Sequence, residues 1–297
     1  MIRRTVPQKT ISKQISLSGV GLHTGKHVNI TFKPAPADTG LVFVRDDVDG
    51  DNLINAHIKY ISNTDRGTNL DNGLFRIHTS EHVLAAITGL DIDNCFICLD
   101  GPEVPIMDGS SKFFINALEQ AKIVEQNVLR EEFFPSEPIS YLCEDTGSKI
   151  SILPDDNYRV NTLVDYKTKV LGEQEASINH ISEFKKEISS ARTFSFLHEL
   201  ETLLENGLIK GGDLNNAIVY VDKPLAESNM EILKKAFNKE SISVTPNGIL
   251  DNLDLHFPNE AARHKLLDVI GDLALIGMKI RGKVIAEKPG HSINAKF

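Results

Sequence analysis

The chain has 297 residues, 41% of them hydrophobic, and a formal net charge of −9. Its length is a soft indication of two domains, and its composition is ordinary for a globular protein. The acidic balance argues against non-specific nucleic-acid binding, because that needs a basic surface. No segment approaches the ~18 apolar residues of a membrane span, and no apolar stretch follows the basic start, so we expect neither a membrane span nor a signal peptide.

Three cysteines, Cys95, Cys98 and Cys143, suit a reducing compartment rather than a disulfide framework, so we expect a cytoplasmic protein. Cys95 and Cys98 spell C-x-x-C within a β-type apolar run. Residues three apart in a strand face opposite sides, so these thiols would not converge on a metal. We interpret them as core residues.

The first predicted element is a β-hairpin. Residues 10–17 alternate in strand fashion, residues 27–32 form a second strand, and the glycine-rich segment 19–25 connects them. Glycine lets the backbone approach a ligand closely, and His23 at the tip could touch a substrate, although an exposed loop histidine usually does not. Short strands and turns are expected over 41–75.

A helix is predicted from about 79 to 89. Thr79 or Ser80 can cap its start, Gly89 can end it, and a strand from Cys95 to Leu99 follows.

The next region predicts where the first domain ends. A loop at 101–111 leads to a helix from Lys112 to about Val128, and the proline-containing segment 129–138 is typical of a linker. We therefore expect a first domain at 1–130 and a second at 131–297. The second domain opens with strands at 139–142, 149–153 and 158–166.

The segment of about 195–221 is strongly apolar. It predicts a β-α-β excursion, with a helix, a turn at Gly211-Gly212 and a strand at 217–221. The pattern alone does not decide between an ordinary core element and a ligand-binding insert. Near the end of the chain, the segment 289–294 is expected to be a loop that carries His291.

Residues 263–272 form the front of an amphipathic helix, with apolar residues at helical spacing. His264 and Asp268 are four residues apart, so they lie about 40° apart on one helical face and can reach one point. An imidazole and a carboxylate that converge there are two ligands of a candidate zinc site. His82 also lies near the start of a helix that precedes a strand, and this weak internal similarity suggests two related halves that meet at one site.

The third ligand has to come from elsewhere in the chain. A hydrolytic zinc site needs three protein ligands, an open position for water and a carboxylate that takes the proton of that water. His82 is the better candidate because Glu81 precedes it, whereas His78 lies before the predicted helix cap. Adjacent Glu-His pairs and His-x-x-x-Asp spacings are common by chance, so the pattern alone leaves this site a hypothesis.

Six motifs occur in one order over nearly the whole chain. They are GVGLHTG at 19–25, TSEHVLAA at 79–86, PIMDGS at 105–110, ARTF at 191–194, HKLLDVIGDL at 264–273 and GHSIN at 290–294. Together they closely resemble the UDP-3-O-acyl-N-acetylglucosamine deacetylase (LpxC) family of lipid A synthesis. Six motifs in order are far more specific than any one of them.

The resemblance implies an α+β fold of two related sheet-and-helix sandwich domains, with the active site between them and a β-α-β insert in the second. It implies Zn²⁺ bound by His82, His264 and Asp268, ligands that ferrous iron would also fit. The substrate would be a UDP-linked N-acetylglucosamine with a 3-O-hydroxyacyl chain, whose acetamide is hydrolysed to acetate and a free amine.

The resemblance also implies roles for individual residues. Glu81 would be the general base, and His291 a protonated stabiliser and general acid oriented by Asp272, although some accounts of such sites give both proton transfers to the glutamate. Thr193 would hydrogen-bond the oxyanion, and Lys265 would meet polar or phosphate groups of the substrate. Further substrate contacts, including those of the acyl chain, would come from Leu22, His23, Phe194, Leu197, Leu200, Gly212, Leu214, Ala217 and Val219.

Two features depart from part of the family. Gly67 stands where some members carry a cysteine near the metal, so no thiol contribution is expected here. Some members continue beyond the position of Phe297 into a hydroxyacyl-carrier-protein dehydratase, so this chain could be the deacetylase part of such a fusion. The runner-up function is a zinc amidohydrolase of another substrate class, and the third is a non-catalytic carbohydrate- or nucleotide-binding module.

Overall fold

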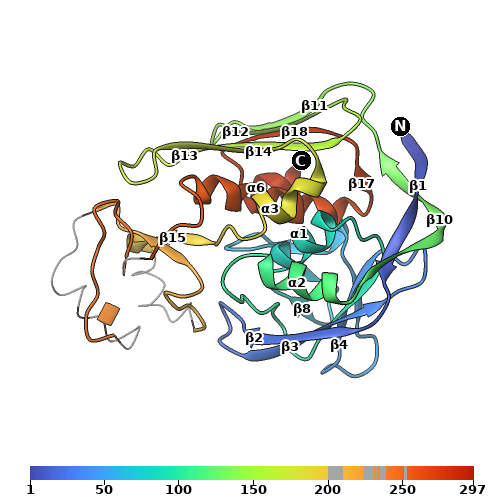
Figure 1. Ribbon diagram of the computed structural model, residues 1–297, viewed down its shortest axis with the longest axis horizontal. Coiled ribbons are helices and arrows are strands. Elements are labelled where there is room, and N and C mark those ends of the chain that lie inside the picture. The colour runs from blue at the N-terminus through green and yellow to red at the C-terminus, as the bar shows by residue number, and fades with distance from the viewer. Residues whose placement is uncertain (200–209, 224–230, 232, 235–238, 251–252) are drawn as a thin grey trace.

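Two five-stranded sheets form the outer layers of the molecule, and helices lie between them (Figure 1). The computed structural model describes residues 1–199, 210–223, 231, 233–234, 239–250 and 253–297. The predicted α+β class is confirmed.

The first sheet contains β2 (Ile15–Val20), β3 (His27–Pro34), β9 (Cys95–Leu99), β4 (Leu41–Arg45) and β5 (Leu53–Asn55), in that order. Its central strand, β9, is antiparallel to β3 and parallel to β4. β2 and β3 form the predicted hairpin, but its first strand begins at Ile15 and extends to Val20, whereas residues 10 and 11 end a separate strand, β1 (Ile2–Ile11). In β3 every second residue from Val28 to Phe32 is buried, which is the period of a strand with one face in the core.

The second sheet repeats this topology. It contains β11 (Ile139–Cys143), β12 (Ser148–Leu153), β18 (Gly282–Glu287), β13 (Tyr158–Asp165) and β14 (Glu173–Ile178), in that order. Its central strand, β18, is antiparallel to β12 and parallel to β13. In both halves two hairpins come first in the chain, and a helix then leads to the central strand. This shared topology supports the expectation of two related halves.

The helices that precede the two central strands are α1 (Glu81–Gly89) and α6 (Glu260–Leu273), and they pack against each other in the middle of the molecule (Figure 1). Gly271 lies at their contact. A Cβ atom there would come 2.1 Å from the Glu81 carbonyl oxygen, so glycine allows an approach that a larger residue would prevent. α6 begins at Glu260, before the predicted start at 263, since Ala261 and Ala262 are buried but too small to extend a clear apolar pattern.

A two-stranded ribbon, at the right of Figure 1, joins the two halves. β1 (Ile2–Ile11) runs antiparallel to β10 (Ile123–Phe133), and the short β17 (Lys279–Ile280) adds parallel to β10. The helix predicted to run to about Val128 is therefore wrong beyond α2, which ends at Gln120. Residues 123–133 become a strand because β1, from the start of the chain, supplies their hydrogen-bond partners.

The segment predicted as a linker, 129–138, is therefore in part a strand. The predicted boundary between residues 130 and 131 falls inside β10, and the division of the chain at that point stays a prediction.

The remaining elements are short. They are α2 (Lys112–Gln120), the strands β6 (Ile61–Asn63), β7 (Asn69–Asp71) and β8 (Arg76–Ile77), and the helical segments η1 (Ile58–Tyr60), η2 (Ile181–Glu183), α3 (Phe184–Glu187), η3 (Ala274–Ile276) and α7 (His291–Lys296). α7 lies where a loop was predicted, because a helix of this length is too short for periodicity to reveal.

The insert, at the left of Figure 1, contains β15 (Phe194–Phe196) and β16 (Ile218–Tyr220). They pair in parallel, and the predicted helix between them lies largely outside the described residues. Leu200 lies outside the described residues, with the rest of the segment 200–209.

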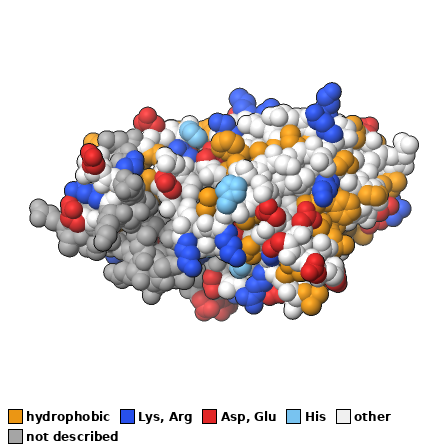
Figure 2. Space-filling view, turned by 90° about the horizontal axis from the view of Figure 1, so that it is seen from below, with side chains coloured by type: hydrophobic (Ala, Val, Ile, Leu, Met, Phe, Trp, Pro, Cys, Tyr) orange, Lys and Arg blue, Asp and Glu red, His pale blue; other side chains and the backbone are white. Residues whose placement is uncertain are grey.

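Charged side chains of both signs are interspersed over the face shown in Figure 2, without one extended basic patch. In the part of the chain that the structure describes, no helix is long and apolar enough to cross a membrane.

Arg130 fastens the ribbon to the first half. Its buried guanidinium pairs with both carboxylate oxygens of Asp91 and lies 3.2 Å from Asp93, and both aspartates lie between α1 and β9. Lys9 of β1 adds a 2.9 Å bond to Asp91. Burial alone would raise the pKa of Asp91, but the bonds from Arg130 and the nearby cations hold it well below its usual range.

We expect Asp91→Asn to lower the free energy of unfolding at pH 7 by about 1–2 kcal/mol, less than for a fully buried pair because 33% of the Asp91 side chain is exposed. A carboxyl whose folded pKa is depressed stabilises the protein above its unfolded pKa of about 4, and that contribution is lost as the pH falls. Urea unfolding should therefore show that the difference in free energy of unfolding between parent and variant becomes smaller from pH 5 to pH 3.

Glu119→Gln is the matched control, because Glu119 pairs at 2.7 Å with Lys185 on the surface, and we expect a change below about 0.5 kcal/mol. If the loss of unfolding free energy caused by Asp91→Asn does not depend on pH, the ionised Asp91 carboxylate does not stabilise the fold through Arg130.

Candidate metal centre and catalytic cleft

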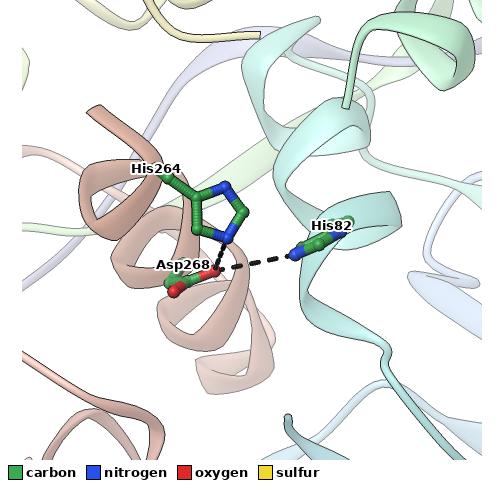
Figure 3. Close-up of side chains that lie close together, drawn as sticks. All are labelled: His82, His264 and Asp268. Carbon is green, nitrogen blue, oxygen red and sulfur yellow. Dashed lines mark ion pairs between the residues drawn. The ribbon is translucent and has the colours of Figure 1, made fainter. Parts of the chain in front are cut away.

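Three buried side chains converge between α1 and α6 (Figure 3). His82 comes from α1, whereas His264 and Asp268 come from one face of α6. Asp268 Oδ1 lies 3.8 Å from His82 Nε2 and 3.4 Å from His264 Nε2, and one ligand atom of each residue lies within 4.8 Å of the others. The predicted i, i+4 pair therefore does meet the predicted third residue.

The polar atoms of this cluster fit a metal ion. Asp268 Oδ1 is fully buried and has no hydrogen-bond partner among the described residues, which is costly unless a cation is bound. His264 Nδ1 lies 3.1 Å from the Ala191 carbonyl oxygen, so it donates its proton there and leaves the Nε2 lone pair towards Asp268. Two imidazoles and one carboxylate are a ligand set typical of Zn²⁺ with an open position.

Charge in the cluster also suits a cation. Burial, followed by the neighbouring His264, lowers the pKa of His82 to about 3, so its ring is neutral at pH 7, as a metal ligand must be. Burial alone would raise the pKa of Asp268, but Lys265 and the nearby imidazoles hold it below its usual range. Lys265 donates to Asp268 Oδ2 at 2.8 Å and leaves Oδ1 free.

Glu81, next to His82, is 2% exposed. Its Oε2 accepts a 2.9 Å hydrogen bond from the Thr68 backbone N–H. Burial raises the pKa of Glu81 to about 7, against the opposing effect of His291. A carboxyl with a pKa near 7 can act as a general base at neutral pH.

His291 begins α7 and faces Glu81 across the cluster. Its Nδ1 lies 2.9 Å from Asp272 Oδ2, and its Nε2 lies 3.9 Å from both Glu81 Oε1 and Asp268 Oδ2. Burial alone would lower the pKa of His291, but Asp272, Asp268 and Glu81 raise it to about 9. The imidazole is therefore charged at neutral pH and can donate a proton.

A cleft of about 320 Å³ opens onto this cluster. Its described lining includes most of the predicted substrate contacts: Leu22, His23, Thr193, Phe194, Gly212, Ala217, Val219 and Lys265. Lys265 Nζ also lies 5.6 Å from the centre of the Phe194 ring. Leu197 and Leu214 pack instead in a small core inside the insert, together with Val219.

A larger cavity of about 700 Å³ adjoins the ribbon and is lined by residues such as Arg130, Tyr158 and Lys279. It contains none of the predicted site residues, so the chemistry of the lining, and not the size of the cavity, marks the site.

Sequence reasoning missed Thr68, Arg66 and Glu199. Arg66 and Glu199 line the cleft, and Thr68 contacts Glu81, Asp272 and His291 from behind it. Thr68 lies beside Gly67 in a stretch whose only pattern is that of short strands, so no local signal points to its role.

The chain matches the family model described as LpxC: UDP-3-O-acyl N-acetylglycosamine deacetylase over residues 8–235 and 226–297. It belongs to this family. It is 45% identical, over 98% of its length, to a bifunctional enzyme LpxC/FabZ of Chlorobaculum tepidum and 42% identical to that of Bacteroides thetaiotaomicron. It is 38% identical to a UDP-3-O-acyl-N-acetylglucosamine deacetylase of Myxococcus xanthus and covers 84% of that protein.

The chain spans 63% of the length of each bifunctional relative. The match to the LpxC family confirms the resemblance that the six motifs indicate.

We expect the purified chain to bind a single zinc ion, and both His264→Ala and Asp268→Ala to lose it, because each removes one of three buried ligands. Metal analysis of purified protein, with iron measured alongside after anaerobic purification, tests this. His180→Ala is the control, since His180 is exposed and its side chain bonds to nearby Ser182, away from the metal cluster. Either ligand variant retaining the parent's metal content would refute the assignment.

Proposed function

We propose that this chain catalyses the zinc-dependent hydrolysis of the acetamide of UDP-3-O-(3-hydroxyacyl)-N-acetylglucosamine to acetate and the free amine, a committed step of lipid A biosynthesis. The observation that carries the proposal is the pairing of Glu81 and His291, 3.9 Å apart, beside the His82–His264–Asp268 cluster. Relatives named as UDP-3-O-acyl-N-acetylglucosamine deacetylases, at 36–38% identity, support the substrate.

His82, His264 and Asp268 would hold the metal. When bound, zinc would supply a Lewis acid that activates water and polarises the amide carbonyl, and ferrous iron would suit the same ligands.

Glu81 takes the proton of the attacking water. With a pKa of about 7, it is about half ionised at neutral pH and can both accept a proton and release it. The Thr68 N–H occupies Oε2, which leaves Oε1 on the side of His291.

His291 gives a proton to the leaving amine. Its raised pKa keeps Nε2 protonated at pH 7, and the bond from Nδ1 to Asp272 fixes the orientation of the ring. A neutral amine is a better leaving group than an amide anion, so a proton is needed at the nitrogen. The alternative, in which Glu81 makes both transfers, would leave His291 a purely electrostatic role.

Thr193 and Lys265 bind the reacting substrate. Thr193 hydrogen-bonds the developing oxyanion, and Lys265 meets polar or phosphate groups. The acyl chain follows the apolar side chains of the insert, where Phe194, Ala217 and Val219 line the cleft.

We further propose that the chain is the deacetylase part of a fusion with a hydroxyacyl-carrier-protein dehydratase, and that it acts in the cytoplasm. Relatives named bifunctional LpxC/FabZ support the fusion, and three free cysteines agree with a reducing compartment. The length of the intact gene tests the fusion, and a stop codon directly after Phe297 would exclude it.

The first experiment is an assay of acetate release from the acylated UDP-sugar by metal-loaded parent, Glu81→Ala and His291→Ala proteins. We expect activity in the parent and a loss of about 100-fold or more in kcat for each variant, because each lacks one proton-transfer group. Both variants should keep the parent's metal content. A parent that binds zinc but leaves this substrate intact would favour an amidohydrolase of another substrate class.

A second experiment tests the acyl passage. Ala217→Trp should fill the apolar side of the cleft and lower kcat/KM for the acylated substrate about 10-fold or more, since a bulky ring displaces the chain. Asn215→Trp, two positions earlier and exposed, is the matched control. Hydrolysis of UDP-N-acetylglucosamine without the acyl chain should change little, and an equal loss for both substrates would argue against the passage.

A further inference from the structure

Thr68 lies at the junction of the two proton-transfer groups and is 1% exposed. Its backbone N–H donates to Glu81 Oε2 at 2.9 Å, and its hydroxyl donates to Asp272 Oδ1 at 2.5 Å. The same hydroxyl oxygen lies 3.3 Å from His291 Nδ1. A single residue thus contacts the base, the acid and the carboxylate that orients the acid.

We propose that Thr68 is a positioning residue that holds Glu81 and the Asp272–His291 pair in one fixed arrangement. The inference rests on the deacetylase function proposed above. Thr68 comes from the first half of the chain, whereas Asp272 and His291, which it contacts, both come from the second half.

The backbone of Thr68 is bound firmly to the start of α1. Its carbonyl oxygen accepts hydrogen bonds from both the N–H and the hydroxyl of Ser80, at 3.1 and 2.8 Å. Ser80 directly precedes Glu81 and sits at the N-cap position, but its hydroxyl makes no capping bond to the helix. The predicted capping residue therefore serves to hold Thr68, and Thr68 in turn holds the carboxylate of Glu81.

The hydroxyl of Thr68 completes the binding of Asp272. Asp272 Oδ2 accepts hydrogen bonds from His291 Nδ1 and from Asn294 Nδ2 at 2.8 Å, so Thr68 is the partner of Oδ1 among the described residues. The aspartate is 5% exposed, and bulk water cannot readily replace the missing donor. Without the hydroxyl, the carboxylate is free to turn, and the imidazole that it orients turns with it.

This arrangement predicts an effect on the rate of the chemical step and not on substrate binding. Thr68 is absent from the described lining of the cleft, so its side chain does not touch the substrate. Loss of the hydroxyl should lower kcat and leave KM nearly unchanged, because an interaction that serves the transition state is removed.

The test compares Thr68→Val, which keeps the shape and removes the hydroxyl, with Thr68→Ser, which keeps the hydroxyl. We expect Thr68→Val to lower kcat about 10- to 100-fold with KM within about twofold of the parent, and Thr68→Ser to restore most of kcat. Zinc content should equal that of the parent in both variants. Thr68→Ala removes the hydroxyl without added bulk and replaces Thr68→Val should that variant fail to fold.

Thr10→Val is the control for loss of a buried threonine hydroxyl. The Thr10 hydroxyl donates to the Asn94 carbonyl oxygen at 2.7 Å, and Thr10 belongs neither to the described lining of the cleft nor to the metal cluster, so the kcat of this variant should stay close to that of the parent. A kcat for the hydroxyl-free variant within twofold of the parent, or a serine variant as slow as the valine one, would overturn the inference. An inactive parent would instead refute the proposed function, so the two failures are distinguishable.

Discussion

The close crossing of α1 and α6 is the constraint on which the site depends. Gly271 lies against the Glu81 carbonyl oxygen at a distance that leaves no room for a Cβ atom. Because the helices approach this closely, His82 on one helix can meet His264 and Asp268 on the other. Glu81, the proposed base, sits at the same contact, so the packing that brings the candidate ligands together also buries the proposed proton-transfer groups.

That burial sets the chemistry of the charged groups. Removal from water raises the pKa of Glu81 to about 7, whereas three surrounding carboxylates raise the pKa of His291 to about 9 in spite of burial. A carboxyl that can be ionised thus faces an imidazole that is protonated, which is the pairing that acid–base hydrolysis of an amide needs. The same arrangement would be costly without a cation between His82 and Asp268, since Asp268 Oδ1 has no partner among the described residues.

Local sequence patterns predicted how the residues of the metal cluster lie on their helices, but they did not predict the strands and contacts around the cluster. The i, i+4 spacing of His264 and Asp268 follows from helix geometry, so sequence alone could place them on one face. The strand character of β10 could not be predicted, because its partner β1 lies at the other end of the first half. The role of Thr68 could not be predicted for a similar reason. Its partner Asp272 is 204 residues away in the chain, and no short sequence pattern encodes such a contact.

The insert is joined to the site by a buried ion pair that also fixes the start of α6. Arg192 donates through its backbone N–H and its Nε to Glu260 Oε1, at 3.0 and 2.8 Å, and Glu260 is the first residue of α6. The residues on either side of Arg192 serve the site, since the Ala191 carbonyl orients His264 and Thr193 lines the cleft. A fully buried Glu260 would be destabilising without Arg192. The pair therefore links the segment that leads into the insert to the start of the helix that carries His264 and Asp268. The proposed substrate passage and the candidate metal ligands are thus attached to each other through Arg192 and Glu260.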